Sequence, residues 1–250
     1  METKLILAVV FLASGLIQGL TGFGFGMVSM SLAPLVIDIK QANILVTILI
    51  LLNSLFVTWR MRHAIDFRKV LPIFLGAIIG VPVGVYLLKI LQPSIIKTIL
   101  GVVLISFSSY SLLRKENIKY IGRRWAFPTG IVSGISTGLI NIGGPPVIIY
   151  TYYQKWDKDS IKATLITFFT MGSIYKVAIL LFSKLVTLEV IKMSGILLPI
   201  MYLGAFLGFV LFEKANREQM RKITFSILVF LGLLLLFKGI TASFLVNGLR

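Results

Sequence analysis

Long apolar runs separated by short basic segments constrain this chain more than any other feature. Six runs of about 17 to 24 residues lie near 43–59, 71–91, 95–113, 163–183, 190–212 and 223–240. Each run is long enough to cross the roughly 30 Å hydrocarbon core of a bilayer. Hydrophobic residues make up 57% of the chain and charged residues 14%, whereas soluble domains are roughly one quarter charged. The sequence therefore predicts an all-α integral membrane protein whose residues 1–250 form a single membrane domain in the lipid bilayer.

Two further apolar regions, 5–37 and 125–153, are too long for one helix and are interrupted by glycine. The first interruption reads GLTGFGFG over residues 19–26, and the second reads GISTGLINIGGPP over residues 134–146. Broken at these glycines, the two regions leave pieces of about 10 to 16 residues, which are shorter than a membrane span. Paired breaks in two halves of a membrane protein indicate a transport site, because broken helices place free backbone groups at mid-depth.

The two halves of the chain can be laid over each other. The matched pairs are Gly15 and Gly19 with Gly130 and Gly134, Gly24 and Gly26 with Asn141 and Gly143, and Gly80 and Gly84 with Gly204 and Gly208. We therefore predict two pseudo-symmetric internal repeats, 4–113 and 125–240, each consisting of a broken helical segment followed by three transmembrane helices.

The distribution of Lys and Arg favours one topology for the broken segments. If both segments are re-entrant hairpins, the basic residues other than Lys176 divide 16 to 8 between the two sides of the membrane. A single crossing by each segment divides them more evenly, and the positive-inside rule favours the stronger bias. Three crossings per half then place the second repeat in inverted orientation, with both termini outside, as in many secondary transporters.

The breaks are the predicted substrate site. A helix start presents free amide hydrogens and the positive end of the helix dipole, which suits an anion. We expect two such starts, after Gly24 to Gly26 and after Gly143 and Gly144, to face each other across the pseudo-symmetry axis. Pro145 suits the first turn of the new helix, and Asn141 either caps that helix or points its amide at a ligand. The candidate substrate-binding residues are Thr21, Gly22, Gly24, Gly26, Asn53, Asn141, Gly143, Gly144, Pro145 and Lys176.

Each candidate has a structural alternative. The glycines at the breaks either serve the site or allow close helix packing, and packing is the favoured interpretation for Gly76, Gly80, Gly84, Gly204 and Gly208. Lys176 is the one charge well inside a predicted span; it either attracts an anion or snorkels to the nearer membrane surface. Asn53 is a lone amide in an apolar helix and needs a hydrogen-bonding partner. Thr164, Thr167, Thr170 and Tyr150 complete a pocket or satisfy neighbouring backbone.

Other classes of function are disfavoured by what the sequence lacks. All nine carboxylates lie near segment ends or in loops, the only histidine is His63, and there is no Cys. A catalytic cluster at membrane depth, a metal site and a cofactor site are therefore not expected. The net charge of +16 follows the positive-inside pattern, and there is no basic domain of the kind that binds nucleic acid.

The paired signatures GLTGFGFG and GISTGLINIGGPP resemble those of the sulfite exporter TauE/SafE family, and the size, span count and two-fold repeat extend this resemblance over nearly the whole chain. Met27 and Asn141 stand where the family often has glycine. The resemblance implies a permease of the prokaryotic cytoplasmic membrane that moves sulfite, sulfonates or related small anions. The leading hypothesis is thus a secondary transporter, not an enzyme, that works by alternating access. An anion channel, a non-catalytic membrane partner subunit and a homo-oligomeric assembly stay open as alternatives.

Overall fold

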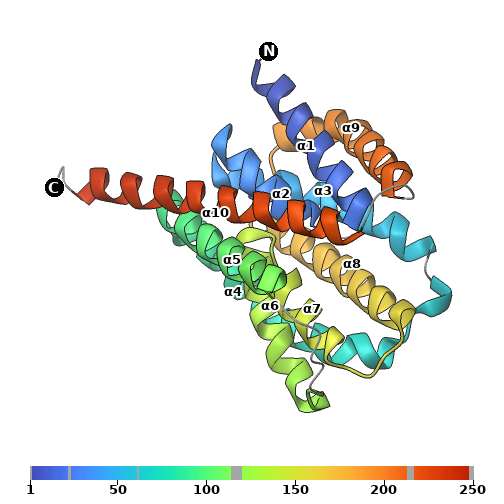
Figure 1. Ribbon diagram of the computed structural model, residues 1–250. Coiled ribbons are helices and arrows are strands. Elements are labelled where there is room, and N and C mark those ends of the chain that lie inside the picture. The colour runs from blue at the N-terminus through green and yellow to red at the C-terminus, as the bar shows by residue number, and fades with distance from the viewer. Residues whose placement is uncertain (1, 22–23, 61, 114–119, 213–216, 248–250) are drawn as a thin grey trace. The chain divides into compact units, whose positions relative to one another are not determined.

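Helices joined by short connections make up the chain (Figure 1). The computed structural model describes residues 2–21, 24–60, 62–113, 120–212 and 217–247, and no strand occurs within these ranges. The α-helices are α1 (Glu2–Thr21), α2 (Phe25–Leu32), α3 (Ile39–Arg60), α4 (Phe67–Ile90), α5 (Pro93–Leu113), α6 (Ala126–Ile140), α7 (Gly144–Tyr152), α8 (Lys158–Phe182), α9 (Leu188–Phe212) and α10 (Arg217–Asn247). Short 3₁₀ helices are η1 (Ala33–Leu35), η2 (Arg62–Ala64) and η3 (Arg123–Trp125). The predicted all-α class is confirmed.

Five helices in the described ranges are long and apolar enough to cross a membrane. Their spans are Glu2–Gly19, Phe67–Ile90, Pro93–Leu113, Ser160–Phe182 and Leu188–Gly208. Four of them coincide with predicted crossings. The apolar stretches Ile39–Leu55 in α3 and Phe225–Thr241 in α10 are shorter than these five spans.

The fifth span corrects the sequence analysis, because it is the first limb of the first break. We expected both limbs of that break to be shorter than a membrane span, yet α1 runs for 20 residues. The α-helix continues through Gly15 and Gly19, and the close approach of α9 to this part of α1 explains why the glycines do not end it. The other limbs are short, with 8 residues in α2, 15 in α6 and 9 in α7.

The chain divides into two compact units. The first contains Met1–Val46, Leu91–Lys115 and Leu188–Arg250, and the second contains Thr47–Ile90 and Glu116–Thr187. The boundary between them falls inside α3. The first break therefore belongs to the first unit, and the second break belongs to the second unit.

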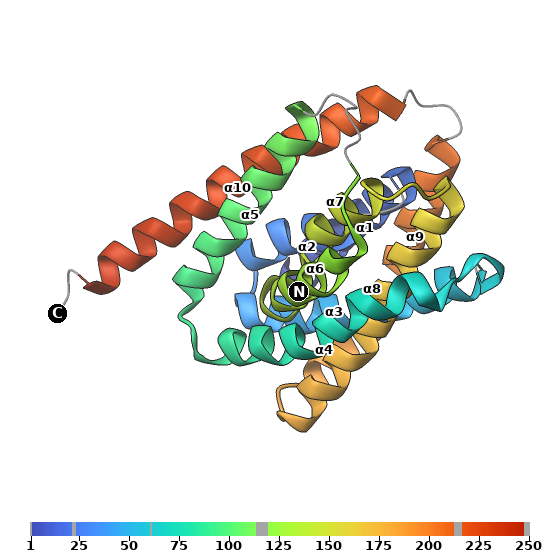
Figure 2. The same cartoon turned by 90° about the horizontal axis from the view of Figure 1, so that it is seen from below.

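In the first unit, α1 packs along α9 and α5 packs along α10. Both Figure 1 and Figure 2 show α5 and α10 side by side. The backbones of α1 and α9 touch: a Cβ added to Gly15 would lie 2.3 Å from the Met201 carbonyl oxygen, and one added to Gly208 would lie 2.1 Å from that of Leu16. Small residues permit such close helix packing in membranes, where dispersion contacts replace the hydrophobic effect as the driving force.

In the second unit, α4 packs along α6, and α8 packs against α4. The close approach is made by glycines facing glycines along both helices, Gly76, Gly80 and Gly84 on α4 and Gly130, Gly134 and Gly138 on α6. A Cβ added to Gly80 would lie 2.3 Å from the Ile131 carbonyl oxygen. With Gly204 and Gly208 on α9 facing α1, the packing interpretation of this set of glycines is confirmed.

The two units share one packing pattern. The helix before the first break, α1, packs on α9, and the helix before the second break, α6, packs on α4. Each helix that leads into a break therefore rests on a long apolar helix from the other half of the sequence. This support positions the end of the helix at which the break occurs.

Apolar side chains cover the exposed faces of the long helices. Leu75, Ile79 and Tyr86 on α4 and Leu203 and Phe206 on α9 are all exposed. Exposed apolar surface on this scale is typical of a face that contacts lipid or a partner. It agrees with the membrane-spanning character of these helices.

Candidate functional site

The second break is a sharp interruption between α6 and α7. Helix α6 ends at Ile140, and Asn141 follows in the left-handed conformation with φ 57° and ψ 23°. Asparagine is among the few residues other than glycine that tolerate this conformation. Helix α7 begins at Gly144, with Gly143 at its N-cap. The Ser133 hydroxyl on α6 donates a hydrogen bond to the Gly143 carbonyl and ties the two limbs together.

The ammonium group of Lys176 lies at this break. Lys176 comes from α8 and is fully buried. Its Nζ donates to the carbonyl oxygen of Thr137 at 2.7 Å and to Oδ1 of Asn141 at 2.7 Å. The Thr47 hydroxyl on α3 donates to the same Asn141 oxygen at 3.1 Å. Three helices of the second unit thus meet at one amide side chain.

The position of the Lys176 side chain distinguishes between a buried ammonium and a side chain that snorkels to the membrane surface. A snorkelling side chain would carry its charge to the membrane surface, whereas this ammonium is buried against the C-terminal end of α6. A cation is favourable there because the last carbonyl groups of a helix carry partial negative charge. The snorkelling alternative is therefore wrong.

The role expected of Asn141 also needs correction. It does not cap the helix that follows the break, since it is the C-cap of α6 and Gly143 is the N-cap of α7. Its backbone N–H donates a hydrogen bond to the Thr137 carbonyl oxygen at 3.2 Å. The same oxygen accepts the hydrogen bond from Lys176 Nζ. Asn141 therefore terminates one helix and joins it to α3 and α8.

The glycines of the second break occupy very different spaces. A Cβ on Gly143 would lie 1.8 Å from Oγ1 of Thr137 and 2.6 Å from the Ser133 carbonyl oxygen. A Cβ on Gly144 would meet its nearest neighbour, Cδ1 of Ile148, at 3.4 Å. Only Gly143 is therefore required by close approach. Pro145 is buried in the first turn of α7, as its missing amide hydrogen allows.

The first break also contains a left-handed residue, but there it is the N-cap of the second limb and not the C-cap of the first. Gly24 adopts φ 98° and ψ −5° at the N-cap of α2, and Gly26 lies in the first turn of that helix. Thr21 is the last residue of α1, and its side chain lies outside the described part of the structure, as does Gly22. Of the predicted site residues, the structure thus brings together Asn141, Gly143 and Lys176.

Hydroxyl groups continue from this cluster along α8. Thr164, Thr167, Thr170 and Ser173 are all buried. The Thr170 hydroxyl donates to the Ile166 carbonyl at 3.0 Å and lies 2.6 Å from the Thr58 hydroxyl on α3. Asn53 is buried on the same part of α3. The Thr167 hydroxyl has no hydrogen-bonding partner among the described residues, which marks a place where water or a polar solute would be bound favourably.

Sequence reasoning missed Thr47 and Ser133. Both are single hydroxyl residues, and Thr47 lies 94 positions from Asn141. Only the fold brings them to the break. Of the two, only Ser133 could have been found from the sequence. It is a polar residue on the helix that leads into the break, where a side chain can satisfy the exposed backbone groups of the break.

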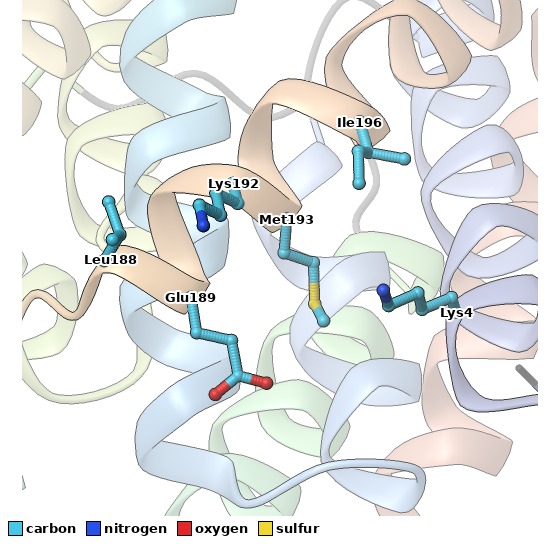
Figure 3. Close-up of a pocket in the computed structure, with 6 residues that line it drawn as sticks. All are labelled: Lys4, Leu188, Glu189, Lys192, Met193 and Ile196. Carbon is cyan, nitrogen blue, oxygen red and sulfur yellow. The ribbon is translucent and has the colours of Figure 1, made fainter.

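Two surface pockets lie elsewhere. One of about 260 Å³ in the first unit is lined by Lys4 of α1 and by Leu188, Glu189, Lys192, Met193 and Ile196 at the start of α9. Figure 3 shows Met193 between the Glu189 carboxylate and the Lys4 ammonium. The other, of about 310 Å³, lies in the second unit at the start of α4 and the end of α7. None of the predicted substrate-binding residues lines either pocket.

The acidic residues of the described segments lie at helix ends. Asp157 is the N-cap of α8, where its carboxylate accepts hydrogen bonds from the backbone and the hydroxyl of Ser160. These bonds stabilise the charged form and lower the pKa of Asp157 below its usual value. In the described ranges, no group of three or more His, Cys, Asp or Glu residues is placed to hold a metal ion.

The long apolar helices define a multi-pass membrane protein. Its two helix breaks with left-handed residues, and the buried ammonium at one of them, are typical of solute carriers. The family model for the sulfite exporter TauE/SafE matches residues 6–235. The chain belongs to this family, and it is accordingly a membrane transporter.

One curated relative, from Cupriavidus necator, is named probable sulfite/organosulfonate exporter TauE. The chain is 26% identical to it over 235 residues, which cover 90% of each protein. No solved structure gives a significant match.

Proposed function

We propose that this protein is a secondary transporter that exports small sulfur-containing anions, such as sulfite or organosulfonates, across the prokaryotic cytoplasmic membrane. The relative from Cupriavidus necator carries a name of this kind, and membership of the family supports the same substrate class. The anion is held at the glycine-rich breaks while the protein alternates between inward-open and outward-open states.

The single observation that carries the proposal is the ammonium of Lys176 buried at the end of α6. A buried cation at membrane depth is costly and is commonly functional. The oxygens of Asn141 and Thr137 hold it beside the start of α7, where the positive end of the helix dipole also favours an anion. Thr167 adds a buried hydroxyl that is free to bind a solute or water.

We further propose that the chain consists of two internal repeats, 4–113 and 125–240, in inverted orientation. The helix packing supports this proposal. The first helix of each repeat, α1 or α6, packs on a long helix of the other repeat, α9 or α4. The left-handed conformations of Gly24 and Asn141 fall at positions that the sequence match pairs with each other. We propose Gly24 and Gly26 at the first break as further substrate-binding residues, and rocking of one repeat against the other as the source of alternating access.

The decisive experiment measures binding and flux with the same anions. Sulfite, sulfate, thiosulfate, sulfoacetate and small carboxylates are tested for thermal stabilisation of the purified protein and then for flux in proteoliposomes. We expect a sulfur oxyanion to stabilise the protein, to move with saturable kinetics and to exchange with itself across the membrane. Flux that does not saturate and shows no exchange would indicate a channel, and the absence of both stabilisation and flux would refute an anion transporter.

A further inference from the structure

The pocket at the start of α4 collects cationic and aromatic side chains from three segments of the second unit. Its volume is about 310 Å³, within the range of small-molecule sites. The lining residues are Asp66, Arg68, Lys69 and Pro72 around the start of α4, Tyr120 and Arg123 around η3, and Tyr150, Gln154 and Trp156 around the end of α7.

The carboxylate in this pocket is already engaged by the protein. Asp66 Oδ1 accepts the backbone N–H of Arg68 at 3.0 Å, and Oδ2 lies 3.8 Å from Nζ of Lys69. Lys69 also donates to the Ser160 hydroxyl at 2.9 Å and lies over the ring of Trp156. The charges of Asp66 and Lys69 therefore cancel, and the pocket keeps the positive charges of the Arg68 and Arg123 guanidinium groups.

Hydrogen bonds hold the three segments in place. Arg123 Nη2 donates to the Arg68 carbonyl at 3.2 Å and links η3 to α4. Gln154 Nε2 donates to the Ile121 carbonyl at 2.9 Å and links the segment before η3 to the end of α7. A guanidinium fixed through one nitrogen keeps its other donors available in a defined direction. The site is thus preorganised before any ligand arrives.

We propose that this pocket binds a tetrahedral oxyanion group, either a sulfonate or a phosphate. The planar guanidinium of arginine matches such oxygens with two parallel hydrogen bonds, and Tyr120 and Tyr150 add hydroxyl donors. Pro72 and Trp156 provide an apolar wall for the carbon that carries the group. Helix α7 separates the pocket from the second break by about 13 Å, at 1.5 Å for each of its nine residues, so the two sites are distinct.

Two sources supply this chemistry, a soluble anion and a phospholipid headgroup. Thermal unfolding of the full-length protein in detergent is measured with methanesulfonate and with inorganic phosphate, against chloride at equal ionic strength. The same protein is then placed in nanodiscs of phosphatidylcholine with and without phosphatidylglycerol. We expect stabilisation in one of the two arms. Stabilisation by the free oxyanions identifies a soluble ligand, and stabilisation by phosphatidylglycerol alone identifies a headgroup.

The variants Arg68→Gln and Arg123→Gln test the site. Each is expected to weaken oxyanion binding about tenfold, as loss of a charge-assisted hydrogen bond implies, and together they are expected to abolish it. Arg124→Gln is the matched control, since Arg124 is exposed beside Arg123 and does not line the pocket. Tyr150→Phe preserves the volume and removes only the hydroxyl.

The outcome is separable from that of the proposed function. Oxyanion stabilisation should persist in a Lys176→Met variant whose transport is impaired, because Lys176 does not line this pocket. Absence of stabilisation in both arms, or equal loss in Arg124→Gln and in the double variant, would overturn the proposal while leaving transport through the breaks untouched.

Discussion

The side-chain nitrogen of Lys176 lies 2.7 Å from the amide oxygen of Asn141, so one break in the helical backbone is joined to the interior of a neighbouring span. The bond links α8 to the C-cap of α6, and Thr47 extends the link to α3. Any movement of α8 during transport must therefore carry the end of α6 with it or break this bond.

Replacing Lys176 by Met tests the role of the buried charge. Met has similar length and no charge, and its burial avoids the desolvation cost of an ammonium; the oxygens of Asn141 and Thr137 keep the Thr47 hydroxyl and the Asn141 N–H as donors. We expect thermal stability to be retained while anion flux in proteoliposomes falls about tenfold or more, which corresponds to about 1.4 kcal/mol of lost interaction. Lys155→Met on the exposed segment after α7 is the control. Normal flux in Lys176→Met would remove Lys176 from the mechanism.

Two substitutions of Asn141 separate its backbone from its side chain. Asn141→Gly keeps the φ of 57° without strain and loses only the amide oxygen, whereas Asn141→Ala loses the oxygen and adds about 1 kcal/mol of left-handed strain. Both variants should lose flux, and the Ala variant should unfold at a lower temperature than the Gly variant. Equal melting temperatures would contradict the assigned backbone conformation.

Gly143 and Gly144 form a matched pair. A methyl group on Gly143 meets the Thr137 hydroxyl and the Ser133 carbonyl, whereas one on Gly144 finds ordinary van der Waals contact. Gly143→Ala is therefore expected to destabilise the protein by about 1 to 3 kcal/mol and to abolish flux, while Gly144→Ala retains the fold. Unfolding curves and flux of the two variants check this, and a tolerated Gly143→Ala would show that the limbs of the break are further apart.

Gly80→Ala probes the packing of α4 against α6. The added methyl group would lie 2.3 Å from the Ile131 carbonyl oxygen, so the helices must separate, at a cost of about 1 to 3 kcal/mol. Gly172→Ala is the control because a methyl group there meets nothing within 4 Å. Comparison of melting temperatures in detergent distinguishes the two, and equal values would argue against the direct backbone contact.

Asp157 predicts a pH dependence. Hydrogen bonds from Ser160 depress its pKa in the folded state, so the stability it contributes is present above its unfolded pKa of about 3.9 and is lost as the pH falls through the lower folded value. The stability difference between the native protein and Asp157→Asn should therefore be constant from pH 5 to 7 and shrink below about pH 4. Unfolding of both proteins across this range measures it, and a constant difference down to pH 3 would be inconsistent with the cap.

The helical class, four of the spans, the packing glycines and the positions of the breaks could be predicted from the sequence. Each of these features depends on local hydrophobicity and glycine spacing. The sequence identified Lys176 as unusual but not its partners, since the bonds to Asn141 and Thr137 depend on how α8 packs against α6. It was wrong about the length of α1, because glycine inside a helix costs only about 1 kcal/mol and Gly15 lies at a close backbone contact with α9. Local pattern shows where a helix is weak, and tertiary packing decides whether it ends.

The pairing of α1 with α9 also has a consequence for biosynthesis. Helix α1 is made first, but its packing partner begins only at Leu188, so at about 5 to 20 residues per second α1 waits for about ten seconds or longer before that partner has been synthesised. Helix α6 follows its own partner, α4, and can dock at once. The second unit, which ends at Thr187, is thus available as a finished scaffold while the glycine face of α1 still contacts lipid or the insertion machinery. Stalling of synthesis after Thr187 has emerged from the ribosome, but before α9 has emerged, would therefore yield an intermediate with a formed second break and an unassembled first one.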